Sequence, residues 1–318
     1  MRILVATSPF ATSGSKPREL LDASGHEIVY NPHGRRLKAG EVEHLLPEMD
    51  AVIAGTEPYP MEVVAKCPRL KVISRVGIGL DNVNVRACTE RGVMVTYTPD
   101  APSQAVAELT VAFMLNLARF VQQSDRSVRE QAWNRIIGWL LEEMTVGIVG
   151  VGRIGGRVVR LLQPFGCRIL CTDISPDESR IEGARVTWTD KDTLLRESDV
   201  VSLHIPMSHK NRHYLGREEL KRMKRGAFLI NTARGGIVDE QALSESLDWG
   251  HLTGAALDVF ESEPYEGPLS NTDRTILTAH IGASAQKSRY LMELGATEDC
   301  LRVLSGEAPQ NPAPPEEL

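Results

Sequence analysis

One short glycine pattern constrains this chain more than any other part of its sequence. Residues 147–155 read Gly-Ile-Val-Gly-Val-Gly-Arg-Ile-Gly, and they lie between a β-branched run and a helical pattern that continues to Leu162. In this setting Gly150 permits a tight turn, Gly152 leaves room for a pyrophosphate, and Gly155 lets the helix pack closely on the strand. The N–H groups that begin the helix suit the phosphates. The pattern therefore predicts a Rossmann-type dinucleotide-binding domain; a glycine turn that serves only packing is the alternative.

An acidic residue after the next predicted strand indicates which dinucleotide to expect. The strand pattern ends at Asp173, about 20 residues beyond the glycines, as the dinucleotide fingerprint requires. A carboxylate there hydrogen-bonds the ribose of NAD and disfavours the 2′-phosphate of NADP. The residues that follow, Ile174-Ser175-Pro176, include no Arg or Lys. We therefore expect NAD as the cofactor.

The rest of the chain alternates short β-branched runs with helical patterns, which favours α/β architecture with parallel sheets. A length of 318 residues, 42% of them hydrophobic, is enough for two domains. A strongly apolar pattern at 104–119 predicts a buried helix that crosses between domains, and the Pro- and Glu-rich residues 308–318 predict a poorly ordered tail. The expected strands are residues 3–6, 27–30, 51–54, 72–74 and 93–96, followed by 146–149, 168–172, 200–204, 228–231, 254–257 and 275–278.

Composition argues against several classes of partner. The net charge is −6, with cations interspersed among the anions, so strong attraction to nucleic acid or anionic lipid is not expected. No stretch approaches the roughly 20 apolar residues of a membrane span, and the N-terminus lacks the features of a signal peptide. The five cysteines are scattered, and the close pair Cys167 and Cys171 has no His beside it. We therefore expect a cytoplasmic protein without disulfides or a metal site.

Three polar residues each follow a predicted strand of the second series. They are Arg234, Glu263 and His280, and the carboxyl ends of parallel strands meet at the edge where open α/β sheets bind ligands. A His exchanges a proton with a substrate hydroxyl, a neighbouring carboxylate favours its charged form, and a guanidinium holds a carboxylate through two parallel hydrogen bonds. This set suits hydride transfer at C2 of a small 2-hydroxy acid. A structural His, a solvated Glu and a phosphate-binding Arg are the alternatives for the single residues.

The motifs taken together resemble the D-2-hydroxyacid dehydrogenase family, and within it the D-3-phosphoglycerate dehydrogenase branch. The resemblance covers nearly the whole chain and is closest from Lys71 to Ala285. Besides the glycine pattern, it rests on Arg75-Val76-Gly77-Ile78-Gly79-Leu80-Asp81-Asn82-Val83, Val106-Ala107-Glu108-Leu109, Leu203-His204-Ile205-Pro206, Asn231-Thr232-Ala233-Arg234-Gly235, Asp258-Val259-Phe260-Glu261-Ser262-Glu263-Pro264 and His280-Ile281-Gly282-Ala283.

The resemblance implies a particular arrangement of two doubly wound parallel-sheet domains. Residues 1–98 and 286–318 would form a flavodoxin-like substrate domain, and residues 99–285 an inserted Rossmann NAD-binding domain. It also implies a homodimer built largely on the NAD-binding domain. We expect the short form, without the regulatory domain of longer phosphoglycerate dehydrogenases.

The resemblance also assigns roles to single residues. Arg234, Glu263 and His280 match the catalytic triad, and the N–H groups of the loop Val76, Gly77, Ile78 and Gly79 would bind the substrate carboxylate together with Arg234 and His280. Arg75 precedes that loop as an Arg does in phosphoglycerate dehydrogenases; it would meet a phosphate or second carboxylate, or else be a surface residue beside a strand. The implied cofactor contacts, besides the three glycines, are Arg153, Ile154, Asp173, His204, Pro206, Thr232, Ala233, Arg234, Asp258, His280 and Gly282.

Two other functions remain open on the same scaffold. NAD(H)-sensing corepressors resemble the family and retain the triad, and phosphite-type dehydrogenases are compatible with it. Formate dehydrogenases carry Gln where this chain has Glu263, which counts against formate. The sequence leaves the hydroxy acid unnamed, since 2-oxo acids of different size share the same anchoring groups.

Overall fold

The computed structural model describes residues 1–314, which divide into two compact units. Unit 1 comprises Met1–Pro102 and the chain from Ala283 onward, and unit 2 comprises Ser103–Gly282. The expected domain limits, 98 and 285, lie four residues before and three residues after these divisions. The turn at 99–102 goes with unit 1 because the long helix of unit 2 begins only at Ser103.

Unit 1 is a parallel sheet of five strands in the order β2-β1-β3-β4-β5, which is the flavodoxin-like order. Its strands are β1 (Arg2–Val5), β2 (Glu27–Tyr30), β3 (Ala51–Ala54), β4 (Val72–Arg75) and β5 (Met94–Thr96). Its helices are α1 (Lys16–Ala23), α2 (Ala39–Leu45), α3 (Met61–Val64), α4 (Val85–Glu90) and α11 (Gln286–Leu304), with a short 3-10 turn at Leu46–Glu48.

Alternate residues of the strands in unit 1 pack under different helices. Ile3 and Val5 share one core with α1 and α11, whereas Leu4 and Ala6 share the other with α2, α3 and α4. This alternation follows from the period of two along a strand. Both faces of the sheet are therefore covered, and the loops at the carboxyl ends of its strands are left as its functional edge.

Unit 2 is a parallel sheet of seven strands in the order β12-β11-β10-β9-β6-β7-β8, the Rossmann order with one further strand. The strands are β6 (Thr145–Val149), β7 (Arg168–Thr172), β8 (Thr187–Trp188), β9 (Val200–Leu203), β10 (Phe228–Asn231), β11 (Gly254–Leu257) and β12 (Thr275–Leu277). The helices are α5 (Ser103–Arg119), α6 (Val121–Arg129), α7 (Arg153–Leu162), α8 (Lys191–Glu197), α9 (Arg217–Arg222) and α10 (Glu240–Asp248), with 3-10 turns at Leu141–Glu143, Gln163–Phe165, Glu178–Ile181 and Pro268–Asn271.

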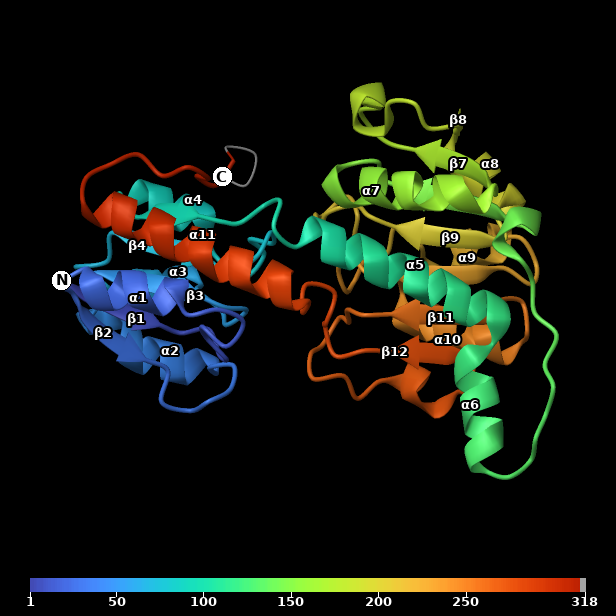
Figure 1. The fold of residues 1–318 in the computed structure, drawn as a ribbon, viewed down its shortest axis with the longest axis horizontal. Helices are drawn as coiled ribbons and strands as arrows, with labels where there is room; N and C mark the ends of the chain where they lie inside the picture. Colours follow the sequence, from blue (N-terminus) through green and yellow to red (C-terminus); the bar gives the residue numbers. More distant parts are fainter. Residues whose placement is uncertain (315–318) are drawn as a thin grey trace. The chain divides into compact units, whose positions relative to one another are not determined.

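The helices of unit 2 cover both faces of its sheet (Figure 1). α5 and α7 share one core with the strands, through Phe113, Met114 and Val158, and α8, α9 and α10 share the other. The expected α/β fold class with two doubly wound parallel sheets is confirmed. The apolar pattern at 104–119 is likewise a helix, α5, whose Met114 is fully buried.

The chain beyond α11 returns to the sheet of unit 1. Tyr97 N donates to Asn311 O at 3.1 Å, Ala313 N donates to Val95 O at 2.8 Å, and the Asp299 carboxylate accepts from Gln310 N at 2.7 Å. The prediction of a poorly ordered tail is therefore wrong for this stretch, because the open edge of β5 and a buried carboxylate satisfy its backbone. Residues 315–318 lie outside the described part.

Residues 1–314 contain neither a single helix suited to span a membrane nor a cluster of side chains suited to hold a metal ion. No single helix in residues 1–314 has the length and hydropathy of a membrane span. The consecutive helices α5 and α6 have that length and hydropathy only when they are counted together, although the chain bends by 61° between them. Within the same residues, no group of three or more His, Cys, Asp or Glu side chains is arranged to hold a metal ion.

Candidate active site

The glycine turn of unit 2 connects β6 to α7. A Cβ built on Gly150, whose φ is +87°, would lie 2.7 Å from the carbonyl oxygen of His204, and one on Gly155 would lie 2.0 Å from that of Gly150. Packing therefore requires glycine at both positions. A Cβ on Gly152 would meet nothing within 4 Å. The turn thus has open space at the one glycine where a pyrophosphate has to approach the backbone, and α7 begins immediately after it.

Asp173 lies beside this turn, directly after β7. Its carboxylate accepts hydrogen bonds from Val151 N at 2.7 Å and from Ser175 N at 2.9 Å. These two bonds fix the carboxylate and use only part of its acceptor capacity. Asp173 is therefore oriented to accept ribose hydroxyls as well, and together with the turn it fits the adenosine diphosphate half of NAD.

His204 follows β9 and packs against the same turn. Its Nε2 lies 2.9 Å from Ser202 Oγ, while its buried Nδ1 has no hydrogen-bond partner within residues 1–314. Burial lowers the pKa of His204 to about 3, so the ring is neutral near pH 7. A buried, unpartnered polar atom of this kind is what a bound ligand satisfies. The next predicted cofactor residue, Pro206, is exposed in the loop beyond it.

The loop after β10 carries Arg234 and is held by Asn231. The Asn231 side chain donates to Arg234 O at 2.8 Å and accepts from Ala233 N at 3.1 Å, which closes a tight turn. Thr232, another predicted cofactor residue, bonds Thr110 of α5 through its hydroxyl at 2.8 Å. Sequence reasoning gave Asn231 no role, although a short polar side chain just before a turn is a recognisable signal.

Glu263 and His280 form a close pair beside each other in unit 2. His280 Nδ1 lies 3.1 Å and 3.0 Å from the two carboxylate oxygens of Glu263, and Phe260 N donates to Glu263 Oε1 at 3.2 Å. The two side chains are 40% and 29% exposed. Glu263 therefore holds the ring through Nδ1 and leaves Nε2 as the nitrogen that can exchange a proton with a ligand.

The Arg234 loop also packs directly on the segment that carries Glu263. A Cβ on Gly235 would lie 1.9 Å from the carbonyl oxygen of Phe260, so glycine is required for this approach. The three residues predicted as a triad thus come from neighbouring loops at the carboxyl ends of β10, β11 and β12. The structure brings them to one edge of one sheet.

Asp258 fixes the loop on which His280 lies. Its carboxylate, in a residue only 1% exposed, accepts from Thr278 Oγ1 at 2.5 Å and from the N–H groups of Ile281 and Gly282 at 2.7 Å each. Burial raises the pKa of Asp258, and these hydrogen bonds partly offset that rise. His280 itself has a φ of +53°, a left-handed conformation that needs such support in a non-glycine residue. Sequence reasoning gave Asp258 and Gly282 only cofactor contacts and missed this clamp.

The predicted substrate loop, Val76 to Gly79, follows β4 in unit 1. Val76 N donates to Ala54 O at 2.9 Å and Gly77 N donates to Thr98 Oγ1 at 2.8 Å, so both groups are already used. The N–H groups of Ile78 and Gly79 make no hydrogen bond within the described chain. The expectation of four N–H groups for a carboxylate is therefore reduced to these two.

Arg75 lies beneath that loop. It is only 6% exposed, and its Nε donates to Gly79 O and Asn82 Oδ1 at 3.1 Å each while its Nη1 donates to Val76 O at 3.0 Å. The alternative of a surface Arg is therefore wrong, because the loop wraps around the guanidinium. These contacts make Arg75 a brace of the loop; its contact with a substrate anion stays a prediction.

Comparison with known proteins places these features in a family. Residues 111–282 match the model of the D-isomer specific 2-hydroxyacid dehydrogenase NAD-binding domain. The chain is 37% identical over 305 residues to a glyoxylate reductase of Thermofilum pendens, covering 92% of this chain and 88% of that protein. The chain belongs to the D-isomer specific 2-hydroxyacid dehydrogenase family. The expected family, enzyme class and NAD cofactor are thereby confirmed.

Other members of the family carry different substrate names. The chain is 40% identical over 264 residues to a D-3-phosphoglycerate dehydrogenase of Methanocaldococcus jannaschii, covering 82% of this chain but only 50% of that protein. It thus spans half the length of that relative. A D-lactate dehydrogenase of Aquifex aeolicus, solved with NAD and lactic acid, has a TM-score of 0.86 and 28% identity, with 96% of each chain covered.

Proposed function

We propose that this chain transfers a hydride between NAD and C2 of a D-2-hydroxy acid, in either direction. The observation that carries the proposal is the Glu263–His280 pair, with contacts of 3.0 and 3.1 Å, on the sheet edge that also carries Arg234 and the glycine turn. When bound, NAD supplies the hydride acceptor, and the residues that would hold it are Gly150, Gly152, Asp173 and the first N–H groups of α7.

The protein residues then bind the acid and move its proton. In unit 2, Arg234 is suited to bind a substrate carboxylate through paired hydrogen bonds. In unit 1, the N–H groups of Ile78 and Gly79 are suited to bind a carboxylate. His280 takes the C2 hydroxyl proton at Nε2 as the alcohol is oxidised, and returns it to the ketone oxygen in the reverse direction. Glu263 stabilises the imidazolium that forms, because its negative charge contacts Nδ1.

A substrate panel tests this function. The protein is incubated with NADH and glyoxylate, pyruvate, hydroxypyruvate or 3-phosphohydroxypyruvate, and NADH absorbance is followed. We expect oxidation with at least one of them. No oxidation at high protein concentration, with NADH binding intact by fluorescence, would contradict the proposal and favour an NAD(H)-sensing binding protein. NAD reduction by phosphite alone would indicate the phosphite reaction instead.

The role proposed for Asp173 has its own test. Asp173→Ala removes the carboxylate that would accept the ribose hydroxyls, and we expect the ratio of kcat/KM for NAD over NADP to fall about 10- to 100-fold, the equivalent of one charged hydrogen bond. An unchanged ratio would contradict the ribose contact. Asp177→Ala, in an acid a few residues beyond whose side chain is 46% exposed, serves as the control.

We also infer a homodimer formed through unit 2 and a cytoplasmic location. An unusual number of large apolar side chains are exposed around α6 and the segment after it, more than a free surface normally carries: Val121, Val128, Trp133, Ile136, Ile137, Trp139 and Leu140. A second copy of this chain, applied through a two-fold axis, covers such a face. The location rests on the free thiols of all five cysteines.

Sedimentation equilibrium tests the dimer. Ile137 is 91% exposed, and we expect Ile137→Asp to give a monomer. Trp249→Asp, in an exposed aromatic residue at the end of α10, is the control and should leave the mass unchanged. A monomeric wild-type protein at micromolar concentration would contradict the inference.

A further inference from the structure

The loop that joins β2 to α2 is a basic segment at the functional edge of unit 1. Residues 31–38 read Asn-Pro-His-Gly-Arg-Arg-Leu-Lys. The strands of unit 1 end level with one another, since Tyr30 lies opposite Val5, Val5 opposite Ile53, and Ala54 opposite Arg75. The basic loop and the loop Val76 to Gly79 therefore leave the same edge of the sheet, where doubly wound proteins bind ligands.

Side-chain contacts hold this loop in one conformation. Asn31 Nδ2 donates to Ala6 O at 2.7 Å and to Arg35 O at 2.8 Å, and its Oδ1 accepts from His33 N at 2.9 Å. Leu37 is buried to 2% exposure and anchors the far end. The loop thus presents its remaining side chains from a fixed backbone.

Glu41, an acidic residue that contacts the loop, already has its own partners. Glu41 accepts two hydrogen bonds from the Arg35 guanidinium, at 2.7 and 2.9 Å, and a third from Lys38 N at 2.8 Å. The Arg35 hydrogen bond, with that from Lys38 N, lowers the pKa of Glu41 to about 2, so this carboxylate is ionised throughout the neutral range. Arg35 and Glu41 therefore neutralise each other.

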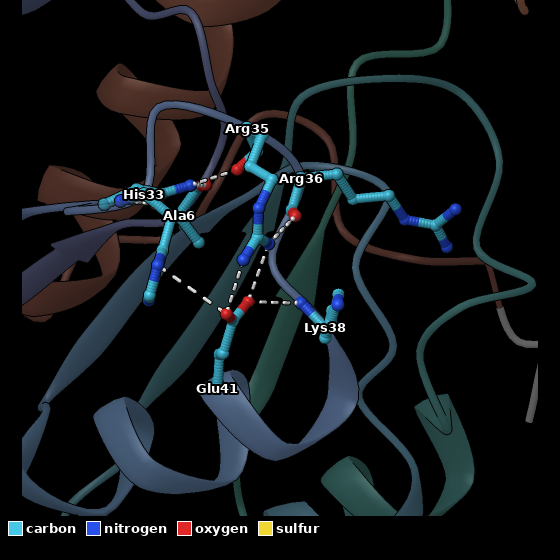
Figure 2. A network of polar contacts seen from close by, with 7 residues as sticks. Ala6, His33, Arg35, Arg36, Lys38 and Glu41 are labelled. Atoms are coloured by element: carbon cyan, nitrogen blue, oxygen red, sulfur yellow. Dashed lines mark hydrogen bonds and ion pairs between the residues drawn. The ribbon is translucent and has the colours of Figure 1, made fainter. Parts of the chain in front are cut away.

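Two cations of the loop are left without an anion. The side chains of Arg36 and Lys38 are exposed and make no hydrogen bond or ion pair with any other side chain in residues 1–314. Figure 2 shows Arg36 extended away from Glu41, in contrast to Arg35. Other arginines of unit 1 already have side-chain partners: the Arg18 guanidinium lies 4.9 Å from the centre of the Tyr30 ring, and Arg289 Nε donates to Glu293 at 2.6 Å. With Arg75 buried, Arg36 and Lys38 are the two cations of the basic loop that remain available to a ligand at this edge.

We propose that Arg36, assisted by Lys38, binds a second anionic group of the substrate, a phosphate carried beyond C2. The inference rests on the proposed function, because it places the substrate carboxylate at Ile78 and Gly79. β2 and β4 are three interstrand steps apart, roughly 14 Å at the usual spacing. The carbon chain of a phosphorylated three-carbon acid and the extended Arg36 side chain together cover this distance, whereas glyoxylate has no group that reaches it. Arg is also the residue best suited to bind a phosphate through paired hydrogen bonds.

A pair of substrates that differ only in the phosphate tests the inference. kcat/KM is measured with NADH for 3-phosphohydroxypyruvate and for hydroxypyruvate, in the wild type and in Arg36→Met, which keeps the aliphatic stem and removes the charge. We expect the ratio of the two kcat/KM values to fall about 10- to 100-fold, through the KM of the phosphorylated substrate. Arg91→Met removes an exposed Arg that precedes β5, at the opposite edge of the sheet, and should leave the ratio unchanged.

Several outcomes would overturn the inference. An unchanged ratio, or an equal loss for both substrates, would show that Arg36 does not recognise the phosphate. A wild type that reduces hydroxypyruvate but not the phosphorylated acid would overturn the phosphate subsite and leave the proposed function intact. If neither is reduced, glyoxylate and pyruvate decide the proposed function on their own, and calorimetry with 3-phosphoglycerate and NAD decides the subsite, since equal affinities of wild type and Arg36→Met would refute it.

Discussion

The two units use the same edge of the same kind of sheet, yet they stabilise their loops in opposite ways. In unit 2 a buried carboxylate, Asp258, accepts three hydrogen bonds and holds the loop of His280. In unit 1 a buried cation, Arg75, donates to Gly79 O, Asn82 Oδ1 and Val76 O and holds the loop of Ile78 and Gly79. An acceptor gathers N–H groups toward itself, whereas a donor gathers carbonyl groups and leaves N–H groups for a ligand.

This difference matches the chemistry assigned to each edge. Unit 1 offers unused N–H groups and the cations Arg36 and Lys38, which suit the anionic ends of a substrate. Unit 2 offers the Glu263–His280 pair, which suits a proton. Unit 1 thus offers groups for anions only, whereas unit 2 carries the proton-transfer pair besides Arg234, so substitutions in unit 1 and at the Glu263–His280 pair should affect different kinetic constants.

The largest effect is expected at the proton-transfer residue. His280→Asn removes the ring nitrogen that exchanges the proton, so kcat should fall about 100- to 10,000-fold, while the dissociation constant for NADH, measured by fluorescence titration, changes little. His213 forms a similar pair with Glu261 at 2.8 Å, and His213→Asn is the matched control with near wild-type kcat. A kcat for His280→Asn within a few-fold of wild type would contradict the separation of roles.

The next largest effect is expected at the carboxylate clamp of unit 2. In Asp258→Asn, the new amide N–H group would face the hydroxyl and N–H donors that bond the carboxylate in the wild type, so part of these hydrogen bonds is lost. This loss should lower the free energy of unfolding by about 3 kcal/mol. The His280 loop should relax, so kcat falls about 10- to 100-fold. Urea unfolding and steady-state kinetics measure both. Asp239→Asn, at the half-buried N-cap of α10, is the control, since the Asn amide oxygen can still accept the single bond from Ala242 N. An unaltered unfolding midpoint for Asp258→Asn would refute the clamp.

Much of this arrangement is predictable from the sequence, because the signals are local. The strand patterns at 27–30, 51–54, 168–172, 228–231 and 254–257 coincide with β2, β3, β7, β10 and β11. The glycine turn, Asp173 and the three predicted triad residues also lie beyond the carboxyl ends of the strands that the sequence patterns indicate. β8 was missed because it is only two residues long.

The braces were not predictable for a different physical reason. Asp258 bonds the loop of Ile281 and Gly282, which follows a separate strand, and only the pairing of β11 with β12 brings them together. In the sequence, nothing distinguishes Arg75 from an exposed cation, because its burial depends on how the following loop folds. A charged residue that holds a loop from inside has the same sequence appearance as one exposed to solvent, so its role depends on tertiary contacts.

A smaller effect is expected at the brace of unit 1. Arg75→Met keeps the apolar stem but loses the hydrogen bonds that shape the loop, so KM should rise about 10-fold for both hydroxypyruvate and its phosphorylated form, with kcat less affected. Arg69→Met breaks an ion pair with Asp50 in the same unit, at 3.0 Å, and is the control. A loss confined to the phosphorylated substrate would instead assign the phosphate contact to Arg75.

The smallest effect is expected at the exposed anchor of the basic loop. Glu41→Gln keeps an acceptor for Lys38 N but removes the charge that holds Arg35, and since exposed ion pairs contribute little, KM for 3-phosphohydroxypyruvate should change only about two- to threefold. Glu43→Gln, on the same helix and paired with Lys66, is the control.

The pH dependence of that effect follows from the pKa of Glu41. The pKa of Glu41 is lowered from 4.5 to about 2 in the folded protein. The stabilisation by its ionised carboxylate is therefore complete at pH values above the pKa of the unfolded state, and it is lost only as the pH falls through the pKa of the folded state. The difference between Glu41→Gln and wild type should therefore be constant from about pH 5 to 8. A difference that appears only at one end of this range would mean that another group, such as His33 at 3.6 Å from Glu41, sets the charge of the loop.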